Sequence, residues 1–138
     1  MSSPDDVRPE AYDLWPSVVA SSRPVRPGVH LLVVVDELDM ATAPQLRQAA
    51  ANALAARPRV LAIDLGGVSF VASAGLGALL RIHQRAAAEG CRMVLVSVPD
   101  PVRRVIGLIG LAGLFVEHET LEAALVALGE PAEGDGDG

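Results

Sequence analysis

A chain of 138 residues is long enough for one domain whose hydrophobic core needs neither a metal nor disulfides. Seventeen acidic residues against eleven basic ones give a formal net charge of −6, which repels nucleic-acid backbones and anionic lipid surfaces. The chain contains no lysine, so reactions that need a catalytic or phosphate-binding ammonium group are excluded.

Cysteine content and hydropathy indicate an intracellular protein that is not inserted in a membrane. Cys91 is the only cysteine, so no internal disulfide forms, and the first residues lack the basic and apolar regions of a secretion signal. The longest apolar blocks, "HLLVVV" and "MVLVSV", are much shorter than the roughly 20 residues of a membrane helix. We therefore expect a cytoplasmic location and no membrane insertion.

The two ends of the chain differ in composition from its middle. Residues 1–16 are rich in proline, serine and charged residues, and we expect them to form a disordered arm. The stretch "SVVASS", residues 17–22, has the composition of an edge strand. Residues 130–138, "EPAEGDGDG", have no apolar anchor and are expected to form a disordered acidic tail. The folded domain is thus predicted over residues 17–129.

Between these ends, strand-like and helix-like patterns alternate. The expected strands cover residues 29–37, 59–67, 92–98 and 115–118, and the expected helices cover residues 42–58, 73–90, 100–115 and 120–129. Strands that alternate with helices form βαβ units with right-handed crossovers. The pattern predicts an α/β fold with a mostly parallel sheet of four to five strands.

Each expected helix has end signals and an apolar face. Thr42, Asp100 and Thr120 stand where N-caps are preferred. Gly90 and Gly129 follow the helices that they end. The residues expected on apolar helix faces are Leu46, Ala50, Ala53, Leu76, Leu79, Leu80, Ala87, Val102, Val105, Ile106, Ile109, Leu121, Leu125 and Leu128. Because aromatic residues make up only 3% of the chain, Ala, Val, Leu and Ile must fill the core.

No complete catalytic or metal-binding pattern is present. "VASAG" keeps only half of the G-x-S-x-G nucleophile motif, because Val71 replaces the first glycine. His83 lies on the helix that Ser73 begins, about 15 Å along its axis, so it cannot deprotonate that serine. The glycines fit neither G-x-G-x-x-G nor the Walker loop. His30, His83 and His118 have no metal-ligand spacing, so we expect no enzyme activity, metal or cofactor.

Acidic residues follow two of the expected strands. Asp36, Glu37 and Asp39 end the first long strand, and Asp64 lies near the end of the next one. Carboxylates at strand ends hold Mg²⁺ in response-regulator receivers, which also use a lysine late in the chain. Because the chain has no lysine, we interpret these residues as solvated carboxylates.

Ser73 lies in the apolar stretch "VSFVASAGLGALL", residues 68–80, at the start of an expected helix. As an N-cap its hydroxyl would accept a backbone N–H, a contact worth about 1 kcal/mol. A helix start also offers unpaired N–H groups and a positive dipole end, which stabilise a phosphate on this serine. Gly75 and Gly77 are expected to let the first turn approach its neighbours closely.

Four stretches lie in order between Val29 and Leu128: "ELDMATAPQLR", "VLAIDLGGVSFVASAGLGALL", "GCRMVLVSVPDPVRRVIGLIGLAGLF" and "TLEAAL". Together they resemble STAS domains, the fold of bacterial anti-sigma factor antagonists. The second stretch is the most specific and resembles the family pattern D-L-S-x-V-x-F-[IM]-D-S-[ST]-G-L-G. The resemblance implies a single STAS-like domain.

The resemblance also implies a switch that is not an enzyme. Family members bind a cytoplasmic anti-sigma factor that is also a serine kinase, and a sigma factor is thereby released. Phosphorylation of a serine in the motif ends the binding. By position that serine is Ser73. The implied docking surface comprises Ala72, Ser73, Ala74, Gly75, Leu76 and Gly77.

Three residues depart from the family pattern. Ala72 replaces the aspartate, Ala74 replaces the second serine or threonine, and Asp36 stands where a glycine is usual before Glu37. The lost aspartate removes a charge that could help orient the hydroxyl or engage the kinase, although an alanine repels a phosphate less. The alternative interpretation is an unphosphorylated STAS scaffold, or a ligand-sensing subunit of a sensory or lipid-transport complex. An uncovered edge strand near the N-terminus would permit two copies to associate weakly.

Overall fold

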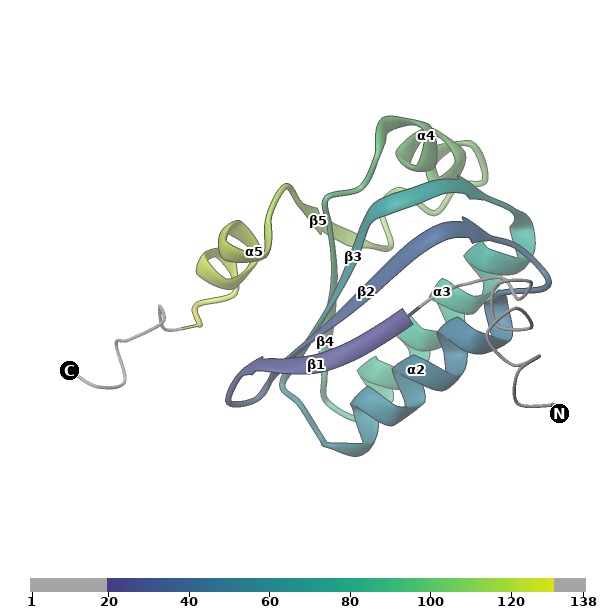
Figure 1. The fold of residues 1–138 in the computed structure, drawn as a ribbon. Helices are drawn as coiled ribbons and strands as arrows, with labels where there is room; N and C mark the ends of the chain where they lie inside the picture. The colour runs from purple at the N-terminus through teal and green to yellow at the C-terminus, as the bar shows by residue number, and fades with distance from the viewer. Residues whose placement is uncertain (1–19, 131–138) are drawn as a thin grey trace, which may run out of the picture.

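Residues 20–130 of the computed structural model form a five-stranded sheet with helices on both faces (Figure 1). Residues 1–19 and 131–138 lie outside the described residues. The predictions for three segments are therefore outside the described residues. These segments are the disordered arm, the first three residues of the edge strand, and all of the acidic tail except Glu130.

The strands and helices alternate along the chain as predicted. The strands are β1 (Ala20–Arg26), β2 (Val29–Leu38), β3 (Val60–Val71), β4 (Arg92–Val96) and β5 (Val116–His118), and the helices are α2 (Ala43–Ala55), α3 (Ser73–Ala88), α4 (Asp100–Leu108) and α5 (Leu121–Ala127). The strands lie in sequence order across the sheet. The β1–β2 pair is antiparallel and the other three pairs are parallel, so the predicted α/β class is confirmed.

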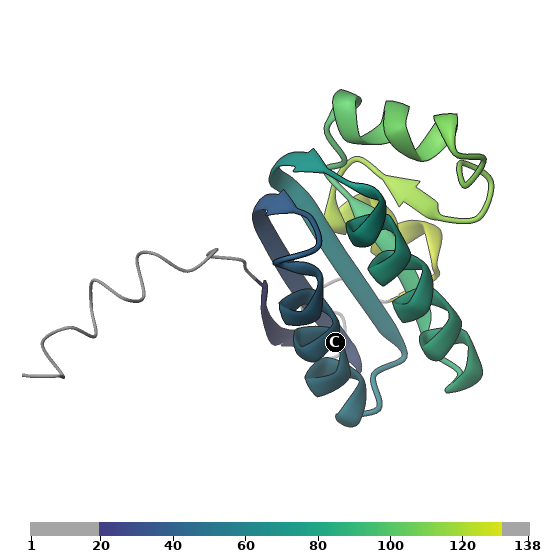
Figure 2. The same cartoon turned by 90° about the vertical axis from the view of Figure 1, so that its right-hand side faces the viewer.

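The sheet separates two hydrophobic cores. On one face α2 and α3 lie side by side, as Figure 2 shows, and together with α4 they cover the larger core. On the other face α5 covers the smaller core with Ala124 and Leu125. Aliphatic side chains dominate both cores, as predicted, and Phe115 is the aromatic residue of the larger one. None of the helices in residues 20–130 has the length and apolarity to cross a membrane.

Most residues predicted on apolar helix faces are buried or half-buried, but two are not. Ala87 is exposed and Ala86 is buried instead, because Ala86 follows Leu79 by seven residues, which is nearly two helical turns. Ile109 is 50% exposed because α4 ends at Leu108, earlier than predicted.

The helix ends agree with the sequence signals in part. The Thr120 hydroxyl accepts from the Ala123 N–H at 3.0 Å and caps α5 as predicted. Gly90 and Gly129 follow the ends of α3 and α5 with φ near 76° and 79°, as predicted for helix stops.

Two predicted caps behave differently. Pro99 is the N-cap of α4, so the prediction for Asp100 is wrong; the Asp100 carboxylate instead lies 2.6 Å from the Arg103 guanidinium. Thr42 is the N-cap of α2 but makes no capping bond. Its hydroxyl donates to the Glu37 carbonyl at 2.8 Å and thereby fixes the turn between β2 and α2.

β1 is an edge strand that offers little for further pairing. It contains Pro24, which has no N–H, and its register with β2 shifts between Pro24 and Arg26. Both features weaken an edge as a template for another strand.

Candidate functional site

The ends of β2 and β3 remain paired past the main sheet and lead the chain into α3. Their pairing runs from Val29 and Val60 to Leu38 and Val71, with a register shift next to Asp36. Asp36 has a φ of 68°, a left-handed conformation that favours glycine. The family pattern has a glycine at this position, and the backbone conformation gives the reason.

The start of α3 packs directly on the end of β2. The Ala72 N–H donates to the Leu38 carbonyl oxygen at 2.8 Å. A Cβ atom at Gly75 would lie 2.8 Å from that oxygen and 2.7 Å from Leu38 Cβ, so the close approach predicted for Gly75 is confirmed. A Cβ at Gly77 would meet nothing within 4 Å, so the same prediction for Gly77 is wrong. Two residues along a helix correspond to about 200° of rotation, which turns Gly77 away from β2.

Ser73 is not the N-cap of α3. Ala72 holds that position with extended angles (φ −103°, ψ 173°), and Ser73 is the first helical residue. The predicted serine cap is wrong because β3 stays paired with β2 through Val71, and the bond from Ala72 to Leu38 places the change from strand to helix at Ala72.

The first turn of α3 is therefore uncapped. It has neither a capping side chain nor an acidic residue. The first N–H groups of a helix lack intrahelical partners and carry the positive end of the helix dipole. The Ser73 side chain is exposed, and its hydroxyl has no hydrogen-bond partner within residues 20–130. An anion attached to this hydroxyl would lie beside unpaired N–H groups.

The six residues predicted for docking all lie at this helix start but differ in exposure. Ser73 is exposed, Ala72, Ala74 and Gly77 are partly buried, and Gly75 and Leu76 are buried. Leu76 belongs to the larger core, and Gly75 forms the contact with β2. These two residues hold the helix in place, whereas Ser73 offers the accessible polar group.

Two exposed apolar side chains, which the sequence analysis missed, lie on the segments that meet at this helix start. Phe70, near the end of β3, is 53% exposed. Met40 is 79% exposed and follows Leu38, whose carbonyl binds the Ala72 N–H. Large apolar side chains mark a protein-binding surface where they form one contiguous exposed patch. The family pattern has a phenylalanine at the position of Phe70, and this could have indicated a role for that residue. No feature of the sequence indicates such a role for Met40.

The acidic residues near the strand ends shape turns. The Asp39 carboxylate accepts from the N–H groups of Ala41 and Thr42 at 3.0 and 3.1 Å. The Asp64 carboxylate accepts from the Gly66 N–H at 2.8 Å. Within residues 20–130, no group of three or more His, Cys, Asp or Glu side chains is arranged to hold a metal ion.

The fold and the site define a class of protein: a small α/β domain that presents a serine at the uncapped start of a helix, where two segments that carry exposed apolar side chains meet. The chain belongs to the STAS domain family, whose model matches residues 21–124. The family predicted from the four sequence stretches is thereby confirmed.

Known proteins of this family that resemble the chain include anti-sigma factor antagonists. The anti-sigma-F factor antagonist RsfB of Mycobacterium tuberculosis is 33% identical over 101 residues, which cover 73% of this chain and 82% of that protein. The crystal structure of an anti-sigma factor antagonist from Mycobacterium paratuberculosis matches 94% of this chain and 100% of its own, with 32% identity and a TM-score of 0.73. Unphosphorylated SpoIIAA, an anti-sigma factor antagonist, matches 83% of this chain and 100% of its own, with a TM-score of 0.68. Its 21% identity establishes likeness of fold alone.

Proposed function

We propose that this protein is an anti-sigma factor antagonist of the cytoplasm. It binds an anti-sigma factor that is a serine kinase, so that a sigma factor is released, and phosphorylation of Ser73 ends the binding. The observation that carries this proposal is the exposed Ser73 hydroxyl, which has no partner within residues 20–130, at the uncapped start of α3. The similarity to RsfB and to the Mycobacterium paratuberculosis protein supports the type of partner.

The surface around Ser73 suits a protein partner. Phe70 and Met40 supply apolar contact area. The open space beside Gly77 lets the backbone of a partner approach the helix. Ala72 and Ala74 add no charge, so the unphosphorylated surface is close to neutral at the serine itself.

A phosphate on Ser73 changes this surface in two ways. It adds nearly two negative charges to an apolar contact area, and these charges would have to lose water when the partner binds. The uncapped N–H groups of α3 stabilise the same charges within the domain. The modified protein is therefore stable by itself and unfavourable in the complex.

The first test is phosphorylation of the full chain by its cognate anti-sigma factor kinase with ATP, with the modified residue mapped by mass spectrometry. Phosphate is expected on Ser73, and Ser73→Ala should remove it. Ser69→Ala is the matched control, because Ser69 is an exposed serine four residues earlier. Phosphate that persists in Ser73→Ala would refute the assignment of the site.

The second test is binding to the same kinase, measured by titration calorimetry. Ser73→Asp should weaken binding at least about tenfold, since a buried unpaired charge costs more than 1.4 kcal/mol, and Ser69→Asp should change it little. Equal affinities of the wild type and Ser73→Asp would argue against the electrostatic switch. If the wild type neither binds the kinase nor accepts phosphate, the scaffold or ligand-sensing alternative is favoured.

A further inference from the structure

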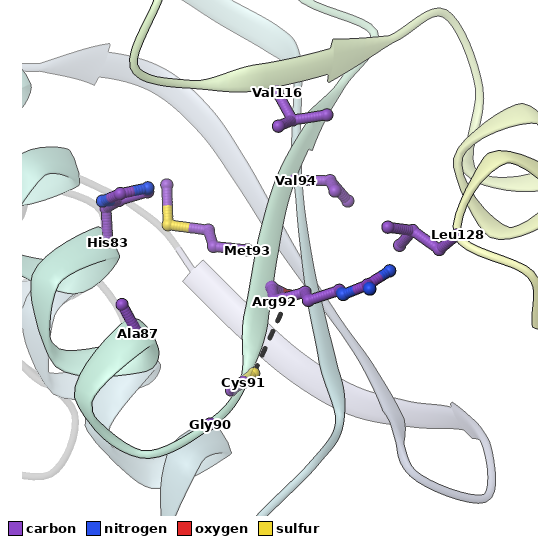
Figure 3. Close-up of a pocket in the computed structure, with 9 residues that line it drawn as sticks. All are labelled: His83, Ala87, Gly90, Cys91, Arg92, Met93, Val94, Val116 and Leu128. Atoms are coloured by element: carbon purple, nitrogen blue, oxygen red, sulfur yellow. Dashed lines mark hydrogen bonds between the residues drawn. The ribbon is translucent and has the colours of Figure 1, made fainter.

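The sheet leaves part of β4 without a neighbouring strand. β5 pairs with Val94, Leu95 and Val96 only, so β4 is uncovered at Arg92 and Met93. A cleft of about 500 Å³ lies at this edge, between the C-terminal half of α3 and the end of α5 (Figure 3).

The walls of this cleft are mainly apolar. Its lining residues are His83, Ala87, Gly90, Cys91, Arg92, Met93, Val94, Val116 and Leu128. Successive strand residues point to opposite sides of a sheet. Figure 3 accordingly shows Met93 on the side of His83 and α3, and Arg92 on the side of Leu128 and α5. An occupant would lie across the strand edge and touch both sides.

Arg92 gives the cleft a charged end. Its guanidinium forms no ion pair or hydrogen bond within residues 20–130. The nearby carboxylates are engaged elsewhere: Glu130 lies 2.7 Å from the Arg59 guanidinium, and Glu89 lies 3.0 Å from that of Arg85. The pKa of Glu130 is lowered, chiefly by its bond to Arg59 and also by the charges of Arg26 and Arg92, so Arg92 lies close enough to act on a neighbouring carboxylate.

The uncovered edge favours a small molecule over a peptide strand. Two uncovered residues are fewer than a typical strand contains. A carboxylate matches the charge of the Arg92 guanidinium, which is exposed and has no partner within residues 20–130, whereas a neutral molecule makes no ionic contact with it. The volume of about 500 Å³ lies within the range of small-molecule sites.

We propose that this cleft binds a small amphipathic carboxylate, with its acyl chain against Met93, Val116 and Leu128 and its carboxylate on Arg92. Ala87 follows Ser73 by 14 residues on α3, about 21 Å along the helix axis, so this site is separate from the proposed docking surface. The inference does not depend on the proposed function.

The test is a titration of the full chain with decanoate below its micelle concentration and with decanol below its solubility limit, followed by amide NMR shifts. Decanoate should shift the amides of residues 91–94 and 116 and bind at least about tenfold more tightly than decanol, as expected for a charge-assisted bond. Arg92→Gln should remove this preference. Arg81→Gln, an equal charge change at an exposed position of α3 outside the cleft, should keep it.

A second pair of variants tests the location. Ala87→Phe should fill the cleft and weaken both ligands at least about tenfold, through lost apolar contact. Ala88→Phe, exposed on the same helix but outside the lining, should not. Equal decanoate affinities in the wild type, Arg92→Gln and Ala87→Phe would overturn the proposal. So would decanoate binding that appears only when Glu133, Asp135 and Asp137 are replaced by amides, because the acidic tail would then be the occupant.

Discussion

Asp36 holds a backbone conformation that most side chains avoid, with a φ of 68° at a register shift between β2 and β3. We expect Asp36→Gly to be more stable than Asp36→Ala by about 1 kcal/mol. Both variants lose the carboxylate, and only glycine adopts a positive φ without steric cost. Urea unfolding of the two variants measures the difference. If alanine proves the more stable, Asp36 does not hold this conformation in solution.

Cys91 is a buried thiol whose pKa is raised to about 11, first by burial and then by the charge of Glu89. With an ordinary pKa of 9.0 in the unfolded chain, the native thiolate fraction at pH 8 is about 100-fold smaller. Alkylation by iodoacetamide should therefore be at least that much slower in the native protein than in urea. A native rate similar to the rate in urea would show that Cys91 is exposed.

The same shift predicts how stability depends on pH. Because the pKa of Cys91 is higher in the folded than in the unfolded chain, its contribution to stability is fully present below pH 9. This contribution is lost as the pH rises through about 11. The free energy of unfolding of the wild type should fall over this window relative to that of Cys91→Ala. Parallel curves for the two proteins would contradict the shift.

At the scale of whole elements, the missing cap of α3 has a measurable effect. Ala72 occupies the N-cap position, where the family pattern has an aspartate. Ala72→Asp should stabilise the protein by about 1 kcal/mol, because the carboxylate accepts N–H groups of the first turn. Urea unfolding measures this gain, and Gln84→Asp, at an exposed position of α3 beyond the first turn, gives the comparison. No gain in Ala72→Asp would mean that these N–H groups are already satisfied.

The packing of α3 on β2 depends on one of its two early glycines. Gly75→Ala should destabilise the protein by about 1–3 kcal/mol, because the new Cβ would meet Leu38 at 2.7 Å. Gly77→Ala should instead stabilise it by about 0.5–1 kcal/mol, because the site is open and alanine favours the helix. Thermal unfolding compares the pair, and two effects of equal sign would refute the contact with Leu38.

The order and type of the elements follow from the sequence, because hydrophobic patterns along each segment decide them. The helix starts do not follow as closely. Ser73 and Asp100 have the residue types of N-caps, yet a tertiary bond to Leu38 fixes the start of α3, and the pairing with Arg103 occupies Asp100. Ser73 itself was found because its motif is local, whereas the segment that carries Met40 meets the start of α3 only through the pairing of β2 with β3.

At the scale of the whole molecule, α5 is the one helix within residues 20–130 that covers the smaller core on its face of the sheet. Leu125 is 2% exposed, and Leu125→Ala should cost about 2–5 kcal/mol of stability. Val126 is 74% exposed on the same helix, so Val126→Ala should change stability by less than about 0.5 kcal/mol. Chemical unfolding of both variants tests this, and similar losses would mean that α5 does not pack in this orientation.

The cleft beside β4 could not be predicted from the sequence. It exists because β5 has only three residues and α5 crosses to the opposite face of the sheet. A short strand at residues 115–118 follows from the sequence, but the part of β4 with which it pairs does not, because no local pattern fixes that register. The sequence therefore predicts the sheet but not the gap at its edge.

In the described part of the chain, only the short helix α5 covers the smaller core, and this affects native-state fluctuations. Seven residues of α5 make few contacts with the sheet, so this helix can detach while the opposite face stays folded. Amide hydrogens of α5 should then exchange with solvent faster than those of α3, and within residues 20–130 proteases should cut near residue 120 first. Because Leu128 also lines the cleft, a molecule bound there would slow both processes and lengthen the lifetime of the closed domain.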